Sequence, residues 1–512
     1  MVNDVKPGGV FLINCQWDEA ELAEKLNAET KQYIAKNNVQ LYTVNAIDLA
    51  AEIGLGKRTN TILQASFFAL ANVLPKDEAI GYMKNAALKF LKKGQDIVDM
   101  NHKAIDAGFG AFKKVDVPAD WANATDDATV AASEGPAKLV KMVDNIMKPV
   151  GAMNGDALPV SAFTDHADGT FEQGASAYEK RGVAVLVPAW DGATCAQCNK
   201  CSYVCPHAVI RPFLVTADEE ANAPKTAKYL NAIGKGLEGL KYTIQISAAD
   251  CTGCEVCVNQ CPAPKGKALS MVPIEEALKA GEQEQASYFF NNVSYKDALV
   301  DKFSNAKNSQ FAQPLFEFSG ACGGCGETPY VKLVTQLFGD RMVVANATGC
   351  SSIYGGSYPA TPYTTNAEGK GPAWANSLFE DNAEFGFGMK VADSALRDQI
   401  AVLMENALAE GVCDEKVKEL FEKWLANREN STVTKEVRDE LVPLLETKDC
   451  ENAKKILGLK NYLVKRSQWV FGGDGWAYDI GYGGLDHVIA NQEDINILVL
   501  DTEVYSNTGG QS

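Results

Sequence analysis

Short apolar runs alternate with longer stretches of helical period over residues 1–130 of the chain. The apolar runs are rich in β-branched and aromatic residues, which is typical of buried strands. The longer stretches place apolar side chains at helical spacing, and Gly94 marks the end of the last one. The predicted elements are strands at 8–15 and 40–47 and helices at 17–37, 60–74 and 78–94. This alternation predicts an α/β layer.

The pattern then changes three times along the chain. Residues 131–180 carry little regular period and predict a linker or a segment that wraps a neighbouring domain. Residues 181–290 are dominated by cysteines, and residues 291–512 return to an α/β pattern. In this last region we predict helices at 328–339 and 485–492, and strands at 341–347, 467–475 (running into a glycine turn) and 495–504.

Eight cysteines fall into two copies of one spacing, C-x2-C-x2-C-x3-C-P. This run ligates [4Fe–4S] clusters in two-cluster ferredoxins, where the fourth cysteine of each run binds the other cluster. The alternatives are a disulfide framework and a zinc ribbon, which needs two C-x2-C pairs instead of quartets ending in proline. We therefore assign one cluster to Cys195, Cys198, Cys201 and Cys261, and the other to Cys251, Cys254, Cys257 and Cys205.

The two cysteine runs repeat at a period of 56 residues, counted from Cys195 to Cys251. This separation is larger than a minimal two-cluster ferredoxin needs. We interpret residues 211–247 as an insertion between the two halves and expect it at the surface, against a neighbouring domain. The region is thus predicted to be a ferredoxin-like α+β domain with an insertion.

The composition of the chain limits which binding partners and which cellular location we expect. The formal net charge of −18 argues against a nucleic-acid partner, because phosphate binding needs clustered Lys and Arg. An acidic electron-transfer partner would need a local basic patch, which composition does not reveal. No apolar run approaches the ~18 residues of a membrane span and no secretory leader opens the chain, so we expect no membrane partner. Abundant thiols then favour a cytoplasmic location.

The C-terminal part of the chain carries a second cofactor signal. Gly473, Asp474 and Gly475 follow an apolar strand, and the next strand ends in a polar loop with Thr502 and Asn507. A carboxylate at one strand end and oxygens at the next can bind Mg²⁺, while glycines and a helix start admit a diphosphate. Alone, GDG is often only a strand-to-turn signal. With an NTGG loop and no G-x-x-x-x-G-K-[ST] motif, the pattern favours thiamine diphosphate with Mg²⁺.

Three further cysteines lie in glycine-rich loops between these two signals: Cys322 and Cys325 in SGACGGCGETPY, and Cys350 in NATGCSSIYGG. Three thiolates are one ligand short of a [4Fe–4S] cluster. A thioredoxin-like dithiol and a zinc knuckle are the alternatives. The remaining cysteines, which we interpret as structural, are Cys15, Cys413 and Cys450.

In their order along the chain, the two cysteine runs, CGGCGETPY, NATGCSSIYGG, GGDGWAYDIG and LDTEVYSNTGGQ resemble the pyruvate:ferredoxin (flavodoxin) oxidoreductases of the 2-oxoacid oxidoreductase family. RTNTILQASFFAL and MNHKAIDAG resemble the γ-type domain of that family. The resemblance implies that residues 1–130 are an incomplete γ-type α/β domain. It also implies that residues 291–512 are a doubly wound α/β thiamine-diphosphate-binding domain. Because fused chains of the family are much longer, we expect an internal fragment, truncated at both ends.

The resemblance also implies roles for individual residues. Mg²⁺ would be bound by Asp474 and Thr502 side chains and by the carbonyl of Val504. A third [4Fe–4S] cluster would be held by Cys322, Cys325 and Cys350, with its fourth ligand beyond residue 512. Asn507 would lie near the reacting atoms as a catalytic residue. The residues implied to contact thiamine diphosphate are Glu327, Cys350, Gly473, Asp474, Gly475, Trp476, Thr502, Glu503, Val504, Tyr505, Ser506 and Asn507.

The implied activity is oxidative decarboxylation of pyruvate to acetyl-CoA and CO₂, with electrons passing through three [4Fe–4S] clusters to ferredoxin or flavodoxin. Coenzyme A would be the second substrate, and we can name no residue that contacts it. The missing remainder of the chain and a second copy in a homodimer are further expected partners. Two alternatives stay open: another 2-oxoacid as substrate, and a non-catalytic iron–sulfur electron-transfer module. The intact GDG and NTGGQ motifs argue against the second.

Overall fold

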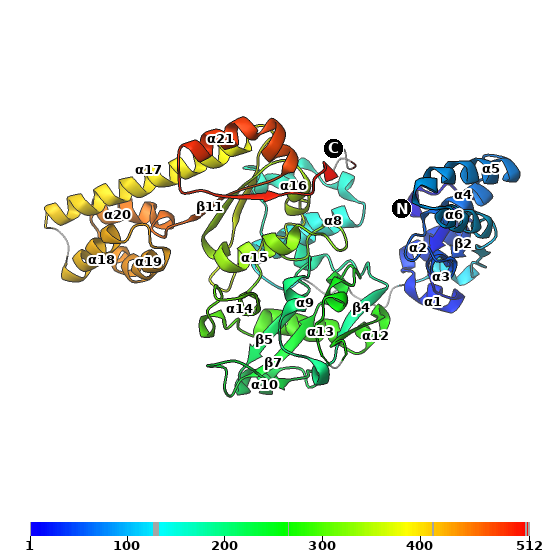
Figure 1. The fold of residues 1–512 in the computed structure, drawn as a ribbon, viewed down its shortest axis with the longest axis horizontal. Helices are drawn as coiled ribbons and strands as arrows, with labels where there is room; N and C mark the ends of the chain where they lie inside the picture. Colours follow the sequence, from blue (N-terminus) through cyan, green and yellow to red (C-terminus); the bar gives the residue numbers. More distant parts are fainter. Residues whose placement is uncertain (1, 126–132, 265, 412–413, 507–508, 510–512) are drawn as a thin grey trace. The chain divides into compact units, whose positions relative to one another are not determined.

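The structure, a computed structural model, describes residues 2–125, 133–264, 266–411, 414–506 and 509 (Figure 1). The chain divides into two compact units, Met1–Ala132 and Ser133–Ser512, and each is considered by itself. Across the described ranges, no helix is both long enough and apolar enough to cross a membrane.

The first unit is a three-stranded sheet with helices packed against it. Strand β1 (Val10–Asn14) runs parallel to β2 (Gln40–Val44), and β3 (Lys113–Lys114) runs antiparallel to β2. The helices are α1 (Glu19–Lys25), α2 (Ala28–Lys36), α3 (Ala46–Ile53), α4 (Asn60–Ala71), α5 (Lys76–Ala87) and α6 (Gln95–Gly108). The predicted strands are β1 and β2, and two of the predicted helices are α4 and α5. As predicted, the helical stretch that begins with α5 ends at Gly94, whose φ of 120° suits glycine.

The single helix predicted at 17–37 is in fact two helices, α1 and α2. Leu26 adopts an extended backbone, and the side chain of Asn27 accepts a hydrogen bond from the N–H of Thr30 at 2.9 Å. An asparagine side chain can satisfy the first N–H groups of a helix, so it favours a new helix start over continuation. The helical spacing of apolar residues does not show that starting a second helix at Asn27 competes with continuing the first.

Residues 133–180 contain short helices and turns, in line with their irregular pattern. The α-helices here are α7 (Ala137–Met142) and α8 (Lys148–Gly151). The N–H of Gly174 donates to the carbonyl of Tyr363 at 2.7 Å, and Lys180 Nζ donates to Asp250 Oδ2 at 2.6 Å. The segment therefore contacts both the C-terminal α/β region and the cysteine region.

Each four-cysteine run lies between two strands, and this strand–run–strand pattern occurs twice. The first run lies between β4 (Leu186–Trp190) and β5 (Ile210–Val215), and the second between β7 (Lys241–Ile246) and β8 (Leu269–Pro273). β4 pairs with β8 and β5 pairs with β7, both antiparallel, so the two halves interlock. The other elements are α9 (Lys200–Tyr203), α10 (Ala217–Asn222), β6 (Leu230–Asn231), α11 (Val256–Asn259), α12 (Ile274–Lys279) and α13 (Glu282–Asn292). The repeat in the cysteine spacing is thus a repeat of the fold.

The expectation that residues 211–247 form a surface insertion is wrong for both ends of this range. All six residues of β5 are buried, and β7 is buried from Tyr242 to Ile246. These two strands form the central pair of the cysteine repeat, because the apolar sequences IRPFLV and YTIQI cover its core. Only the part from 216 to 240, with α10 and β6, lies outside this strand pair.

The C-terminal region is built on a four-stranded parallel sheet in the order β10-β9-β11-β12. Successive residues of β11 face opposite sides: Val470 packs with α17 and α21, and Phe471 packs with α15 and α16. Helices therefore cover both faces of the sheet. The elements are α14 (Ala306–Ser309), α15 (Thr328–Phe338), β9 (Met342–Asn346), α16 (Cys350–Gly355), β10 (Ala373–Asn376), α17 (Asn382–Ala409), β11 (Ser467–Gly473), α21 (Tyr482–Ala490) and β12 (Asn496–Leu500).

A separate helical cluster lies between β10 and β11 in the sequence. The long helix α17 leads from the sheet to α18 (Glu415–Ala426), α19 (Ser431–Glu446) and α20 (Glu451–Gly458), which pack around the buried Trp424 (Figure 1). Of the cysteines interpreted as structural, Cys15 is buried, whereas Cys450 is exposed at the start of α20 and holds no core position. Cys413 lies outside the described residues.

A buried ion pair joins the cysteine region to the segment that leads into α15. The guanidinium of Arg211, on β5, donates to the carboxylate of Glu317, to the hydroxyl of Tyr295 at 3.0 Å and to the carbonyl of Ala208 at 2.9 Å. It also lies 4.1 Å from the ring centroid of Phe290. Both members of the pair are at least 90% buried, so neither charge has water to replace a lost partner.

We therefore expect Arg211→Met to lower the free energy of unfolding by about 3–5 kcal/mol, because it leaves the Glu317 carboxylate buried and uncompensated. The measurement is a urea titration of the anaerobically purified protein. Arg438→Met is the matched control, since Arg438 pairs with an exposed aspartate and should cost less than about 1 kcal/mol. The account is wrong if adding Glu317→Gln to the Arg211 variant brings no recovery.

Candidate functional site

Two small cavities lie inside the cysteine region, and four cysteines line each of them. In each set, three cysteines come from one run and the fourth comes from the other run. The first cavity is lined by Cys195, Cys198, Cys201 and Cys261, with Trp190, Asn199, Tyr242, Pro262 and Leu269. The second is lined by Cys205, Cys251, Cys254 and Cys257, with Pro188, His207, Ile210 and Met271. The structure thus brings together the two sets that the spacing predicts.

The cysteines of each set enclose a volume and do not converge on one point. In the part of the chain that the structure describes, no three Cys, His, Asp or Glu side chains are placed to hold a single metal ion. The described cysteines are free thiols, with no disulfide among them. In a [4Fe–4S] cluster each thiolate binds a different iron, so the ligands surround the cluster. The geometry therefore fits a cluster in each cavity better than a zinc ribbon or a disulfide framework.

The same backbone conformation recurs in both runs. Gln197 and its counterpart Gly253 have positive φ angles of 52° and 64°, and the residues two positions further on share this conformation. The N–H of Gln197 points to Cys195 Sγ at 3.4 Å, and the N–H of Gly253 points to Cys251 Sγ at 3.3 Å. Hydrogen bonds of this kind stabilise a thiolate and tune the potential of a bound cluster.

Burial keeps the thiols of Cys201 and Cys251 neutral in the absence of metal. It raises the pKa of Cys201 and of Cys251 to about 12, and neighbouring cysteines act in the same direction on both. A bound cluster would have to displace these protons, and its iron would provide the positive charge that stabilises the thiolates. Cys198 is the exception in burial, because it is exposed and opens the first cavity toward solvent.

The three remaining motif cysteines also lie close together. Cys322 and Cys325 lie in the loop before α15, and Cys350 is the first residue of α16. Burial raises the pKa of Cys350 to about 11, and the neighbouring Glu327, Cys325 and Cys322 reinforce this direction. The N–H of Glu327 points to Cys325 Sγ at 3.4 Å, as in the two runs. The predicted ligands of the third cluster thus form one group, with Glu327 beside it.

Asp474, Thr502 and Val504 meet at the carboxyl ends of β11 and β12. The two strands are parallel neighbours, with Gly473 opposite Leu500. Thr502 Oγ1 lies 3.4 Å from Asp474 Oδ1 and 3.0 Å from the carbonyl oxygen of Val504. A carboxylate, a hydroxyl and a carbonyl are oxygen ligands of the kind that Mg²⁺ prefers. The edge of a parallel sheet where strands end is also a common ligand position in α/β folds.

Glu327 lies between this oxygen-rich edge and the third cysteine group. Burial raises the pKa of its carboxyl, the charge of Asp474 acts in the same direction, and the hydroxyl of Tyr354 acts in the opposite one. Its Oε2 is buried and accepts no hydrogen bond of good geometry from the described residues, although the hydroxyl of Tyr354 lies nearby. A buried oxygen without a donor is costly, so this atom fits a site where a ligand supplies the donor.

The other predicted cofactor residues lie in or beside the loop that follows β12. Ser506 Oγ lies 2.8 Å from Thr502 Oγ1 and so joins the oxygen-rich edge. Gly475 lies so close to Tyr505 that a Cβ there would stand 1.8 Å from the tyrosine ring. The neighbouring Glu503 is exposed and bends the loop with a φ of 62°. These positions shape the loop that follows β12.

Two further predicted residues are Trp476 and Asn507. The side chain of Trp476 is fully buried and packs against Gly472 and Gly481 in the core under α17 and α21. The indole ring of Trp476 therefore packs in the core, and a contact between this residue and the cofactor stays a prediction. Asn507, the predicted catalytic residue, lies outside the described residues.

His207 links the second cavity to the third cysteine group, and sequence reasoning missed it. Its imidazole lines the cavity, with Nδ1 3.1 Å from the carbonyl of Ser319 and Nε2 3.3 Å from the carbonyl of Cys322. Gly324, in the same loop as Cys322, packs near Cys254. The position of His207 two residues after Cys205 was visible, but nothing in the sequence shows which distant loop it contacts.

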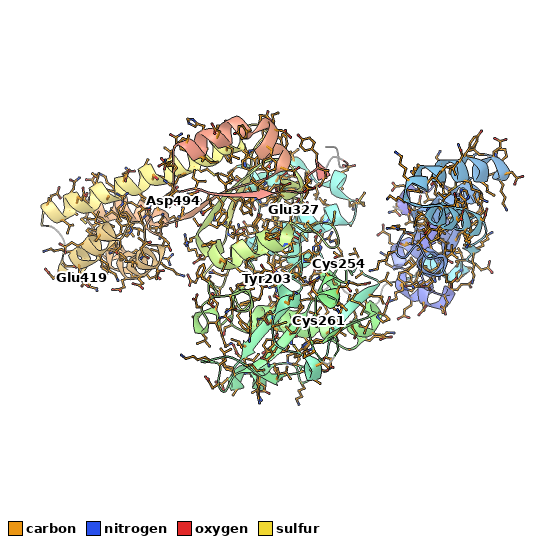
Figure 2. All side chains as sticks on the ribbon, viewed as in Figure 1. Tyr203, Cys254, Cys261, Glu327, Glu419 and Asp494 are labelled. Atoms are coloured by element: carbon orange, nitrogen blue, oxygen red, sulfur yellow. The ribbon has the colours of Figure 1, made fainter. Side chains whose placement is uncertain are left out.

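These contacts arrange the site residues in a series. The oxygen-rich edge adjoins Glu327 and the third cysteine group, which adjoins the second cavity. The second cavity adjoins the first. Cys257 of the second lies close enough to Cys201 of the first for Cys201 to raise its pKa electrostatically. Figure 2 labels Glu327, Cys254 and Cys261, one residue from each successive part. The series ends at the exposed Cys198.

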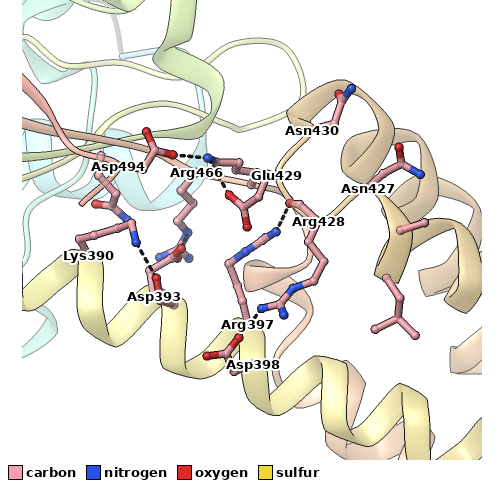
Figure 3. A pocket seen from close by; sticks show the side chains of 15 residues that line it. Lys390, Asp393, Arg397, Asp398, Asn427, Arg428, Glu429, Asn430, Arg466 and Asp494 are labelled. Carbon is pink, nitrogen blue, oxygen red and sulfur yellow. Dashed lines mark hydrogen bonds and ion pairs between the residues drawn. The ribbon is translucent and has the colours of Figure 1, made fainter. Parts of the chain in front are cut away.

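A much larger cavity than these two, with a volume of about 630 Å³, lies elsewhere in the second unit, between α17 and the helical cluster (Figure 3). Its cations already have partners: Arg397 donates to the carbonyl of Tyr462 at 2.8 Å, and Arg428 pairs with Asp398 at 2.5 Å. It is lined by charged and amide side chains without a cysteine. We interpret it as a polar seam between the helical cluster and the sheet, separate from the site.

Three family models match parts of the chain. Residues 1–111 match a model described as pyruvate ferredoxin/flavodoxin oxidoreductase, and residues 194–264 match a 4Fe-4S double cluster binding domain. Residues 129–184 match a third model, a domain of unknown function. This third match falls on the segment predicted to be a linker or wrapping segment.

Curated relatives are similar to the chain over its whole length. A pyruvate:ferredoxin oxidoreductase of Moorella thermoacetica is 49% identical over 520 residues, which are 100% of this chain and 44% of the relative. A pyruvate-flavodoxin oxidoreductase of Enterobacter agglomerans is 49% identical over 519 residues, or 99% of this chain and 43% of the relative. A mitochondrial pyruvate dehydrogenase [NADP(+)] of Euglena gracilis is 44% identical, with 28% of its length covered. The chain thus spans less than half of these relatives, and the resemblance predicted from the motifs is confirmed.

The crossed cysteine sets predict a pairing of variants. Cys261→Ser and Cys198→Ser should abolish or convert the same [4Fe–4S] signal, because their side chains line one cavity. Cys205→Ser and Cys254→Ser should affect the other signal. The measurement is electron paramagnetic resonance (EPR) of the dithionite-reduced protein, with iron and sulfide determined chemically. If Cys261→Ser instead matches Cys254→Ser, the crossed assignment fails.

Proposed function

We propose that this chain forms the iron–sulfur and diphosphate-binding part of an enzyme that oxidises pyruvate to acetyl-CoA and CO₂. Ferredoxin or flavodoxin would receive the electrons. The names of the relatives support the reaction class, and the match to a double-cluster domain supports the clusters. The observation that carries the proposal is the unbroken series from the Asp474 edge to the exposed Cys198.

The residues at the sheet edge fit thiamine diphosphate and Mg²⁺. We assign Asp474, Thr502 and the carbonyl of Val504 to the metal, on the basis of their shared edge. The unpartnered Oε2 of Glu327 would accept a hydrogen bond from the cofactor. When bound, thiamine diphosphate supplies the electron sink that decarboxylation of a 2-oxoacid needs. Glu327 would orient the cofactor, and Asp474 would hold the metal that neutralises its diphosphate.

The third cysteine group is proposed to receive electrons first. Cys322, Cys325 and Cys350 supply three thiols, and the fourth ligand of a [4Fe–4S] cluster would come from a residue other than these. The N–H of Glu327 at Cys325 Sγ would stabilise the thiolate, as the equivalent amides do in the two runs. Electrons would then pass to the cluster of the second cavity and on to that of the first.

The exposed end of the series offers a docking face for an acidic electron carrier. Cys198 is exposed there, and Ile233, whose N–H binds Gln197 Oε1, is 62% exposed. Lys200, the first residue of α9, and Lys235, in the loop of Ile233, are exposed as well. These two lysines would supply positive charge to the face of a chain with net charge −18, beside the exposed carboxylate of Glu238 in the loop of Lys235. The acceptor itself stays a proposal, since a relative named for NADP⁺ is also similar.

Two alternatives from the sequence remain open. No residue that would bind the 2-oxoacid is identified, so the same site is compatible with a 2-oxoacid other than pyruvate. A non-catalytic electron-transfer module would need the clusters and not the oxygen-rich edge. The alignment of Asp474, Thr502 and Val504 favours catalysis, because an electron carrier has no use for a metal-diphosphate site. Coenzyme A contacts likewise remain unassigned.

Replacing Asp474 by Asn should weaken Mg²⁺-dependent binding of thiamine diphosphate by at least about 10–100-fold, because the site loses its carboxylate. Pyruvate-dependent reduction of viologen should fall with it, while iron and sulfide content stays unchanged. The control is Asp486→Asn, an exposed aspartate on α21, which should change neither. Full cofactor binding by the Asp474 variant would contradict the assigned metal site.

Reversing the charge of Lys235 or Lys200 to Glu should lower kcat/KM for ferredoxin by roughly three- to tenfold at low salt, and raising the ionic strength should narrow this difference. Reduction of methyl viologen should be unaffected, because a small carrier needs no docking face. Lys418→Glu, on the exposed face of α18, is the matched control. An equal loss with methyl viologen would place the defect inside the cluster chain and contradict the docking face.

A further inference from the structure

Lys332 is a fully buried lysine that the reaction outlined above does not use. It lies on α15, the helix that begins beside the third cysteine group, and only 1% of its surface is exposed. Its Nζ donates to the carbonyl of Ser202, to that of Tyr203 at 3.1 Å and to that of Cys205 at 3.3 Å. All three acceptors belong to the first cysteine run. A side chain from the sheet region thus ends inside the cluster region.

The three carbonyls indicate that this amine carries its full charge. An ammonium has three N–H donors, and here each has one acceptor. A neutral amine would turn its lone pair toward a carbonyl oxygen, which is repulsive. Two of the acceptors close the short helix α9, whose C-terminal carbonyls favour a cation. Among the ion pairs of the described residues, none joins Lys332 to a carboxylate.

Lys332 faces cysteines of both cavities. Cys205 lines the second cavity, and Ser202 directly follows Cys201, which lines the first. The side chains of Cys205 and Cys201 both lie close enough to interact electrostatically with the ammonium group of Lys332. An unpaired buried cation is costly unless negative charge lies nearby. Four thiolates around a [4Fe–4S] core carry that negative charge, and it grows by one when the cluster is reduced.

We infer that Lys332 is a fixed positive charge between the two cavities that raises the reduction potentials of both bound clusters. The reduced state of a cluster gains more from a nearby cation than the oxidised state does. This stabilisation of the reduced cluster is large because the site is buried, and charges interact more strongly there than in water. Lys332 thereby makes both clusters better electron acceptors for the third cysteine group. The inference rests on the proposed cluster binding.

The test is an EPR-monitored redox titration of three variants of the whole protein, purified anaerobically. Lys332→Met removes the charge at similar length, and Lys332→Arg keeps it. Lys302→Met is the matched control, because Lys302 Nζ also donates to a carbonyl of α15, that of Gln336 at 2.9 Å, away from both cavities. We expect more negative midpoint potentials for both clusters in Lys332→Met. The arginine and control variants should stay close to the wild type.

Iron and sulfide content separates this inference from the function on which it rests. A wild-type protein without the two cluster signals would refute the cluster assignment itself. Unchanged potentials in a fully loaded Lys332→Met would overturn the inference and leave Lys332 a structural tie. If Lys332→Met does not retain its clusters, Lys332→Gln is titrated instead. Loss of clusters from both neutral variants, with retention by the arginine variant, would likewise assign Lys332 a structural role.

Discussion

Each four-cysteine cavity is completed by a cysteine from the other half of a repeated fold, and this crossing constrains the rest of the second unit. Cys205 can line the cavity of the second run, and Cys261 that of the first, only if the two halves interlock. The pairings of β4 with β8 and of β5 with β7 provide this interlocking. Covalent bonds from each cluster to both halves would then fix these strands. Residues of both strand pairs line each cavity, so the fold and the proposed metal sites depend on each other.

Buried charges join the cysteine region to the region of the parallel sheet. Arg211 reaches Glu317, and Lys332 reaches the carbonyls around α9, both across the boundary between the two regions. Such groups are costly to bury unless their partners are held in place. Both contacts therefore favour one relative placement of the clusters and the parallel sheet. A fixed placement is what electron transfer along a series of sites requires.

The sequence predicted the parts of the site whose chemistry depends on local spacing. The crossed cysteine sets and the Asp474–Thr502–Val504 group follow from motifs, because strand ends and short loops place such residues without knowledge of distant contacts. Longer-range features were missed or misread. The strands β5 and β7 looked like an insertion, since their core role depends on pairing with each other. The burial of the Trp476 side chain was not expected either, because it depends on packing against helices distant in the sequence.

The central claim is that electrons released at the Asp474 edge reach the two four-cysteine cavities. The most direct test is EPR of the enzyme containing this chain, frozen after mixing with pyruvate, coenzyme A, thiamine diphosphate and Mg²⁺, with no external acceptor. The account predicts that reduced [4Fe–4S] signals appear and match those produced by dithionite. Clusters that dithionite reduces but pyruvate leaves oxidised would contradict it.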